Sequence, residues 1–307
     1  MKLKVAILLF LLSIQLIFAQ ETILWKIEKP GSQKVSYLLG TLHQVGNSFV
    51  DERPLIKELL SHSDIAVFES VDDKKKTIID VMNSRPDNFS YREHLDKKDV
   101  QFLESISTDW TVPISKATPA ELAVKLEQLY VLEVCETTKS TDTEKHLDDY
   151  LLSVAEKVKI KTVGLETNAD QFKALNSMQI YDWKAVKEGI GARVKNLQKK
   201  KDKNQLCSIA NTYLSDMNFD YQFNVKCENG AMLSDRNKKW IPQIDQILQN
   251  NNAFIAVGLM HIFWDCGIIS ELRKLGYKVT PVPLLKYSAK NTAILSSLQN
   301  EKILVAR

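Results

Sequence analysis

The sequence predicts an α/β (α+β) fold in which two related halves form a central, mainly parallel sheet, with a helical insert between them. In each half, an apolar strand leads into a Gly-x-x-His motif, and a helical stretch and a second strand follow. Such a unit is a βαβ crossover, which implies parallel strands. Between the halves the pattern is mostly helical, at about residues 85–160 and 180–250.

The chain begins with the layout of a secretory signal peptide, residues 1–19. Lys2 and Lys4 form a positive start, an apolar run reaches Phe18, and Ala19 provides a cleavage site. The run is shorter than the roughly 20 residues of a membrane-spanning helix, so cleavage is favoured over an uncleaved anchor. No cysteine directly follows it, which argues against a lipoprotein. We therefore expect export to the periplasm or beyond, and no membrane span in the mature chain.

The first half carries the first motif. Residues 35–39 have the pattern of a strand, and Gly40 and His43 bound the turn that follows. A helical pattern then leads to a second strand, residues 64–68, which ends at Glu69. This order predicts that His43 and Glu69 follow two strands of one sheet.

The insert contains two clear helix signals. Residues 118–121 read Thr-Pro-Ala-Glu, a capping box with proline at the first helical position, and they open a helix that continues to Leu132. Apolar residues at spacings of three and four from Leu147 to Val158 predict an amphipathic helix. It leads into a third strand that ends at Glu166, and a polar helical region at about residues 182–213 is expected to cover the sheet.

The second half repeats the order of the first. A strand at residues 253–257 runs into Gly258 and His261, and a helical stretch and a strand at 276–280 follow. We expect residues 20–285 to form one domain and residues 286–307 to be a C-terminal tail.

Ionisable side chains follow four of the predicted strands: His43, Glu69, Glu166 and His261. Ligands bind at the carboxyl ends of parallel strands, because loops and helix N-termini converge there. Two imidazoles and two carboxylates are suited to metal binding or general-base chemistry. A single histidine there is often a turn residue, and the glutamates could be first-turn acids of helices. The matched positions of the two histidines favour a site.

Arg236 shares a helical stripe with apolar residues that include Trp240, so its charge should point inward and meet a carboxylate or a substrate. Asn237 follows it directly. Asp148 borders the apolar stripe of its own helix, and a surface acid is favoured there over an anchor for Arg236 or a ligand. The remaining histidines are expected to be structural: His62, His94 and His146.

Charge and cysteine content limit the partners. The net charge of +3 includes Lys2 and Lys4, so the mature chain is near neutral and does not favour nucleic acid or an anionic membrane. Four cysteines permit three pairings, and Cys207 with Cys227 closes the shortest long-range loop. The absence of Cys-x-x-Cys spacing argues against a redox motif or a zinc knuckle.

Several segments resemble the TraB/PrgY/GumN family, which includes the Tiki metalloproteases and is distantly similar to erythromycin esterases. They are residues 39–43, Glu69, residues 163–167 with Gln171, Arg236 with Asn237, and residues 257–261. The chain departs from the family pattern after the second histidine, at Phe263-Trp264-Asp265, and before the third strand, at His146-Leu147-Asp148. The resemblance implies a sheet with paired Gly-x-x-His motifs, a divalent-metal site, and hydrolysis of peptide or related bonds.

The leading expectation is an exported, Tiki-like or GumN-like metal-dependent hydrolase for a peptide or small-molecule substrate. His43, His261 and Glu69 would hold zinc, manganese or cobalt with an open position for water. Glu166 would act as general base or orient a ligand, and Arg236 with Asn237 would steady the substrate carbonyl.

Two alternatives stay open. In a metal-independent, esterase-like hydrolase, His43 and Glu69 would activate water directly. In a binding protein, the histidines would hold a peptide or a haem-like ligand without turnover.

Overall fold

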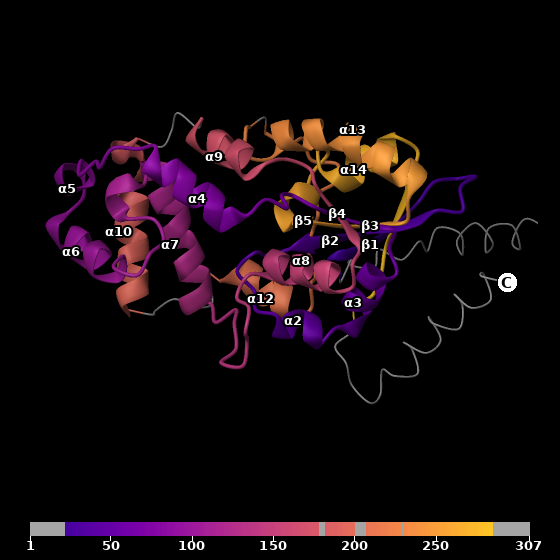
Figure 1. Ribbon diagram of the computed structural model, residues 1–307, viewed down its shortest axis with the longest axis horizontal. Coiled ribbons are helices and arrows are strands. Elements are labelled where there is room, and N and C mark those ends of the chain that lie inside the picture. The colour runs from indigo at the N-terminus through magenta and orange to yellow at the C-terminus, as the bar shows by residue number, and fades with distance from the viewer. Residues whose placement is uncertain (1–21, 178–181, 200–206, 229, 285–307) are drawn as a thin grey trace, which may run out of the picture.

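A computed structural model describes residues 22–177, 182–199, 207–228 and 230–284 (Figure 1). The predicted signal peptide and the C-terminal tail lie outside these residues. Within the described ranges, no helix has the length and apolar character needed to cross a membrane.

The centre of the protein is a six-stranded sheet in the order β4-β3-β5-β2-β1-β6. Strands β2 to β5 run parallel to one another, and β1 pairs antiparallel with β2 and β6. The strands are β1 (Leu24–Glu28), β2 (Val35–Thr41), β3 (Ile65–Phe68), β4 (Lys161–Gly164), β5 (Ala253–Gly258) and β6 (Lys278–Pro281). The predicted α/β class and the mainly parallel sheet are confirmed. Strand β1 was not predicted.

The two βαβ halves interleave in the sheet. Strand β5 lies between β2 and β3, and β2 and β1 lie between β5 and β6. As a result, β2 and β5 are direct parallel neighbours, with Thr41 opposite Gly258. The two Gly-x-x-His turns therefore leave the sheet side by side.

Helices cover both faces of the sheet, with α13 and α14 on one face and α2, α3 and α8 on the other (Figure 1). Strands β3 and β5 are buried along their whole length, in keeping with their unbroken apolar sequences. The helices and 3₁₀ turns of this part are α2 (Ser48–Asp51), α3 (Pro54–Ser61), α8 (Leu147–Lys157), α9 (Asn168–Asn176), α12 (Ser208–Leu214), α13 (Ser234–Asn250), η2 (Leu259–Ile262) and α14 (Ile268–Lys274).

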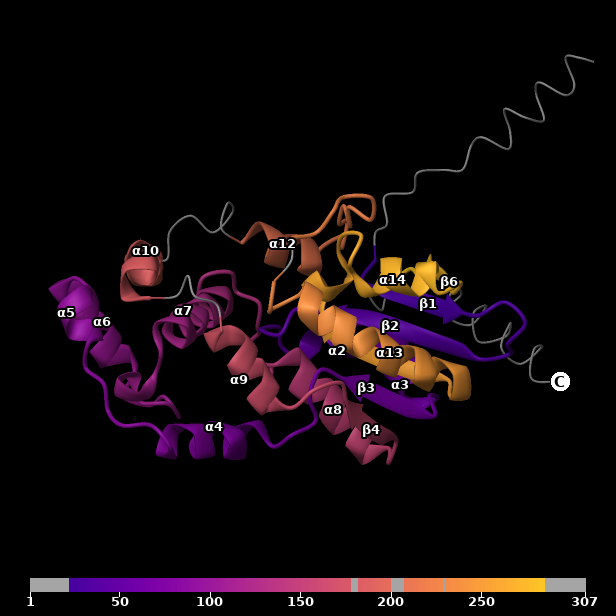
Figure 2. The same cartoon turned by 90° about the horizontal axis from the view of Figure 1, so that it is seen from above.

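A helical lobe stands at one end of the sheet (Figure 2). It consists of α5 (Tyr91–His94), α6 (Lys97–Ile106), η1 (Ile114–Lys116), α7 (Pro119–Glu133) and α10 (Trp183–Lys199), and α4 (Lys74–Asn83) leads into it. Apolar side chains of α5, α6, α7 and α10 form a second core, separate from that of the sheet. The expectation that residues at about 182–213 cover the sheet was wrong for α10, whose apolar face packs into this lobe, whereas Tyr213 of α12 packs into the core of the sheet.

The predicted capping box is present at the start of α7. Thr118 accepts from the Glu121 backbone, and the Glu121 side chain accepts from the Thr118 backbone. The Arg85 guanidinium also binds the Glu121 carboxylate through two hydrogen bonds.

Two disulfides join Cys135 to Cys207 and Cys227 to Cys266. The favoured pairing of Cys207 with Cys227 was wrong. Cys207 lies in the lobe core beside Tyr130, whereas Cys227 lies in a loop whose backbone binds Asp265. Loop length does not predict the pairing because the folded chain brings more distant cysteines together.

Candidate functional site

The two motif turns are in contact. A Cβ on Gly40 would lie 2.8 Å from Leu259 Cδ1 and 3.0 Å from Ile262 Cδ1, so glycine lets the second turn pack against β2. The Tyr213 hydroxyl donates to the Gly40 carbonyl over 3.0 Å. The first turn is thus fixed from both sides.

His43 forms a pair with Asp148 on helix α8. Its Nδ1 lies 2.5 Å from Asp148 Oδ2, and Asp148 Oδ1 accepts from the Thr41 hydroxyl over 2.7 Å. An ionised carboxylate is only an acceptor, so Nδ1 carries the proton in this contact and Nε2 is the basic nitrogen. Asp148 is therefore the partner of His43, rather than the favoured surface acid.

Glu69 follows β3 and is buried between the two turns. Its Oε1 accepts from the Gly258 backbone N–H over 2.7 Å. A Cβ on Gly258 would lie 3.0 Å from this oxygen and 3.1 Å from His43 Nε2. The glycine at the end of β5 thus allows Glu69 and His43 to approach the same point.

Arg236 on α13 connects the two glutamates with His261. It donates to Glu166 Oε1 through Nε (2.9 Å) and Nη2 (2.6 Å), and to Glu69 Oε2 through Nη2 (2.6 Å). Its Nη1 donates to the Met232 carbonyl (3.1 Å) and lies 3.0 Å from His261 Nε2. A guanidinium has five N–H donors, and these contacts use all of them. The charge points inward and meets two carboxylates.

His261 is only 3 % exposed and lies between Asn237 and Arg236. Its Nδ1 donates to Asn237 Oδ1 over 2.7 Å, so Nε2 accepts from the guanidinium. Burial lowers the pKa of His261 to about 3 against the opposing effect of Glu69, and Arg236 and His43 act in the same direction as burial. His261 is therefore neutral at physiological pH.

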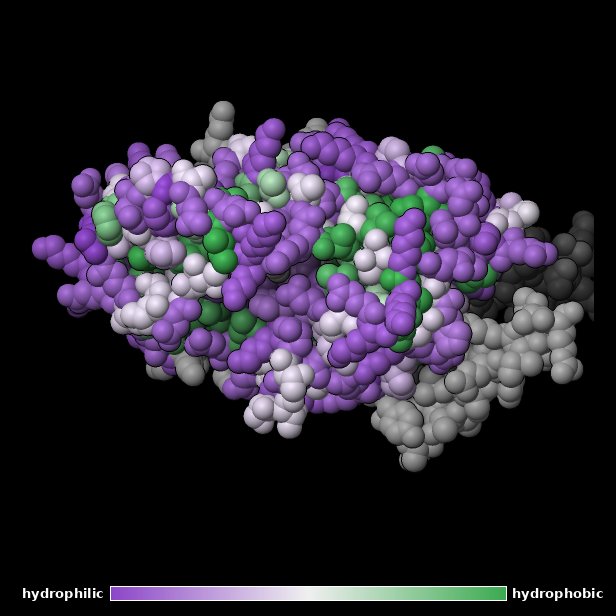
Figure 3. All heavy atoms as spheres, in the orientation of Figure 1, coloured by the Kyte–Doolittle hydropathy of each residue, from purple (hydrophilic) through white to green (hydrophobic). Residues whose placement is uncertain are grey.

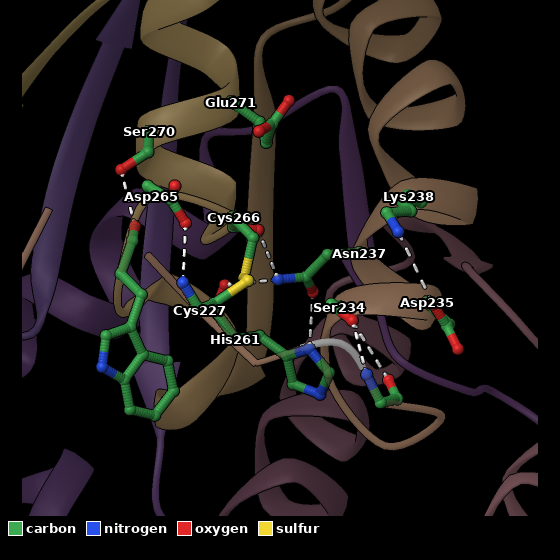
Figure 4. Close-up of a disulfide and its surroundings, with 12 residues drawn as sticks. Cys227, Ser234, Asp235, Asn237, Lys238, His261, Asp265, Cys266, Ser270 and Glu271 are labelled. Atoms are coloured by element: carbon green, nitrogen blue, oxygen red, sulfur yellow. Dashed lines mark hydrogen bonds and ion pairs between the residues drawn. A yellow bond between two sulfur atoms is a disulfide. The ribbon is translucent and has the colours of Figure 1, made fainter. Parts of the chain in front are cut away.

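The Asn237 amide is also fully engaged. Its Nδ2 donates to the carbonyls of His261 (3.2 Å) and Cys266 (3.0 Å). The Cys227–Cys266 disulfide lies next to this amide (Figure 4). The second disulfide is thus linked to His261 through one side chain.

Glu69 and Arg236 are held in their charged forms. Burial opposes ionisation of Glu69, yet the positive charge of Arg236, 2.6 Å from Glu69 Oε2, holds the pKa of this carboxyl below the usual value. Burial opposes the charge of Arg236 as well, but Glu69 and Glu166 raise its pKa. The site contains a buried ion-pair network.

A cleft with a volume of about 310 Å³ opens beside His43, where α4 and α7 meet α8, α9 and the strand ends. Its polar wall contains His43, Gln44, Glu69, Asp72, Gln128, His146, Asp148, Asp149, Gln171 and Arg236. Its apolar wall contains Phe68, Ile78, Val124, Leu152, Phe172, Leu175 and Met232. Figure 3 shows apolar patches on either side of the hydrophilic middle of this face. The cleft suits a ligand with both polar and apolar parts.

The residues do not fit the expected metal ion as they are arranged. His261 Nε2 and Glu69 Oε1 lie 3.7 Å apart, a separation that ligands of one ion can have. However, the Arg236 guanidinium contacts both residues where the ion would bind. In the described chain, the group that brings three potential ligand atoms within 4.8 Å is Cys227, Asp265 and Cys266, and its two sulfurs are bonded to each other.

The structure brings all six predicted site residues together beside the cleft. Glu69, Glu166, Arg236, Asn237 and His261 form one hydrogen-bond network, and His43, bound to Asp148, lies next to Glu69. Sequence reasoning missed the role of Asp148 and of Trp240, whose indole N–H donates to Glu166 Oε2 over 3.3 Å and whose ring lies 4.4 Å from that of His261. It also missed His146 in the cleft wall. The position of Asp148 at the border of an apolar stripe was the available signal for its role.

Among known protein families, the model of the TraB/PrgY/gumN family matches residues 23–281, which include both motif turns and the whole network. No curated protein and no solved structure matches the chain.

Proposed function

The chain belongs to the TraB/PrgY/gumN family, and on this basis we propose that it is a hydrolase that uses His43 as a general base for water in the cleft. The observation that carries the proposal is the His43–Asp148 pair. It places a histidine that is 46 % exposed at the cleft wall with its orientation fixed by a carboxylate.

The chemistry follows from this pair. Nε2 of His43 takes a proton from water as the water oxygen attacks a substrate carbonyl, and Asp148 stabilises the imidazolium that forms. Glu69, held ionised beside His43, adds to that stabilisation. The same imidazolium can then donate its proton to the leaving group.

Arg236, Asn237 and His261 hold Glu69 and the second turn in place. The contacts of Arg236 and Asn237 already use their N–H groups, so the arrangement gives no support to their expected role at the substrate carbonyl. In this proposal Glu166 binds Arg236 and Trp240, and is neither base nor ligand.

A peptide or small ester substrate and an exported location are part of the proposal. The polar and apolar walls of the cleft support the first. The two disulfides support the second, since such bonds persist in oxidising compartments.

The test uses the mature, disulfide-bonded chain with a panel of chromogenic esters and fluorogenic peptides. We expect turnover that falls about 10²–10⁴-fold in His43→Ala and also falls in Asp148→Asn. His62→Ala, an exposed histidine at the end of α3, is the matched control and should keep wild-type activity.

The same assay separates the alternatives. Activity that survives a chelator supports the metal-independent reaction. Activity that is lost with a chelator and restored by zinc, manganese or cobalt would support the metal-dependent hydrolase instead. Binding of peptide or haem without any turnover dependent on His43 would support the binding protein.

A further inference from the structure

We propose that Arg236 is the built-in cation of this site and takes the place of a metal ion between His261, Glu69 and Glu166. The proposal concerns what the site binds and is independent of whether the site hydrolyses a substrate. Its test can therefore fail while the proposed function stands, and the reverse also holds.

The guanidinium of Arg236 is surrounded by side chains that could otherwise bind a metal ion. Arg236 Nη1 lies 3.0 Å from His261 Nε2, and Nη2 lies 2.6 Å from both Glu69 Oε2 and Glu166 Oε1. One imidazole nitrogen and two carboxylates are a ligand set that zinc and related ions accept. Here all three atoms are directed at one guanidinium.

The site already contains the positive charge that its carboxylates require. Two buried carboxylates require positive charge, and Arg236 supplies it at a side-chain exposure of 8 %. A divalent ion added at the same place would lie against the guanidinium, and the repulsion would be weakly screened in this buried setting.

Contacts on several sides hold Arg236 in a fixed position. Its side chain donates to the Met232 carbonyl, and its guanidinium lies 4.6 Å from the centre of the Trp240 ring. His261 is itself held by Asn237. For a metal to reach His261 Nε2, the guanidinium would have to leave all of these contacts.

A specific consequence follows. Without the guanidinium, His261, Glu69 and Glu166 would remain as an imidazole and two unpaired buried carboxylates. Arg236→Met keeps an apolar side chain over Trp240 but removes the charge, so it should destabilise the fold and create a binding site for a divalent ion.

The experiment compares the full mature, disulfide-bonded wild type with Arg236→Met and with the double variant Arg236→Met/His261→Gln. Co²⁺ and Zn²⁺ are the probes, followed by equilibrium dialysis, by the visible absorption of bound Co²⁺, and by thermal unfolding. We expect no His261-dependent metal binding in the wild type. We expect Arg236→Met to bind metal and its Tm to rise by roughly 5–10 °C at about 100 times the Kd. The double variant should lose most of this gain.

Two results would overturn the proposal. One is a wild-type protein that binds Co²⁺ or Zn²⁺ and loses it in the single variant His261→Gln. The other is a folded Arg236→Met protein that gains no metal binding. If Arg236→Met does not fold, the test is the metal binding of the wild type compared with that of His261→Gln. Equal metal binding by these two proteins supports the proposal.

Discussion

At the scale of single residues, burial gives two histidines of the same motif different chemistry. His43 is 46 % exposed in its side chain and binds a carboxylate, so it can exchange protons with water in the cleft. His261 is 3 % exposed and lies between an amide and a guanidinium, which keeps its imidazole neutral. The Gly-x-x-His spacing is identical in both, so the sequence could not distinguish their roles.

The depressed pKa of His261 predicts a loss of stability in acid. Its pKa is about 3 in the folded protein and about 6.5 in the unfolded chain, so between these values only the unfolded chain binds the proton. This contribution to the free energy of unfolding is complete above pH 6.5 and decreases as the pH falls towards 3, by up to about 1.4 kcal/mol per pH unit. Urea unfolding measured across this range should show a shallower pH dependence in His261→Gln than in the wild type. His62→Gln is the control, and equal slopes in wild type and His261→Gln would contradict the prediction.

Substitution of the two motif glycines should affect different properties, stability for Gly40 and activity for Gly258. Gly40→Ala places a methyl group 2.8 Å from Leu259 and 3.0 Å from Ile262, and such overpacking should cost about 1–3 kcal/mol of stability. Gly258→Ala places it 3.0 Å from Glu69 Oε1 and 3.1 Å from His43 Nε2, so its main effect should be on kcat/KM. Thermal unfolding and activity assays separate the two. Gly189→Ala on α10 meets open space and should leave both unchanged or raise stability slightly. A Gly258→Ala enzyme with full activity would show that Glu69 and His43 need not approach this point.

At the scale of elements, local patterns predicted most strands and helices, but not their order in the sheet. The apolar runs of β3 and β5 are continuous, β2 has a mainly apolar run, and the capping box of α7 is a strong local signal. The interleaving of the two halves depends on pairing between distant strands, which no local pattern contains. Strand β1 pairs antiparallel with β2. It was not predicted because its sequence is short and mixes apolar with charged residues.

The capping box of α7 gives a test at this scale. Thr118 accepts from the Glu121 backbone and donates to Asn176 on α9 over 2.7 Å. Thr118→Ala removes both contacts and should lower the free energy of unfolding by about 1–2 kcal/mol, measured by urea unfolding. Thr108→Ala, at an exposed turn, should stay within about 0.5 kcal/mol of the wild type. Equal effects of the two substitutions would mean that the cap does not stabilise α7.

At the scale of the whole molecule, the two disulfides serve different parts of the fold. Cys135–Cys207 connects the end of α7 with the start of α12 in the helical lobe. Cys227–Cys266 lies next to Asn237 and, through it, His261. The cleft lies between these two parts, and only the second bond has a hydrogen-bonded connection to the residues of the site.

Removal of each disulfide should therefore have similar effects on stability and different effects on activity. The bonds close loops of 72 and 39 residues, and by loop entropy each contributes about 4 kcal/mol. We expect comparable losses of Tm in Cys135→Ser/Cys207→Ser and Cys227→Ser/Cys266→Ser. Only Cys227→Ser/Cys266→Ser should also lower the kcat of the molecules that remain folded. Without this disulfide, the Cys266 carbonyl that accepts from the Asn237 amide is no longer held in position. An equal fall in kcat in both variants would refute a specific link between the second bond and the site.

The order of the disulfides along the sequence also affects oxidative folding of the chain. Each bond joins cysteines that are consecutive along the sequence, Cys135 with Cys207 and then Cys227 with Cys266. A chain that emerges from its N-terminus into an oxidising compartment exposes Cys207 when Cys135 is the only partner present. The first bond that can form is thus the native Cys135–Cys207 bond. Both thiols are then already oxidised when Cys227 enters the compartment. Disulfide formation while the chain emerges from its N-terminus should therefore give the correct pairing with little isomerisation. When the complete reduced chain refolds, all three pairings are possible.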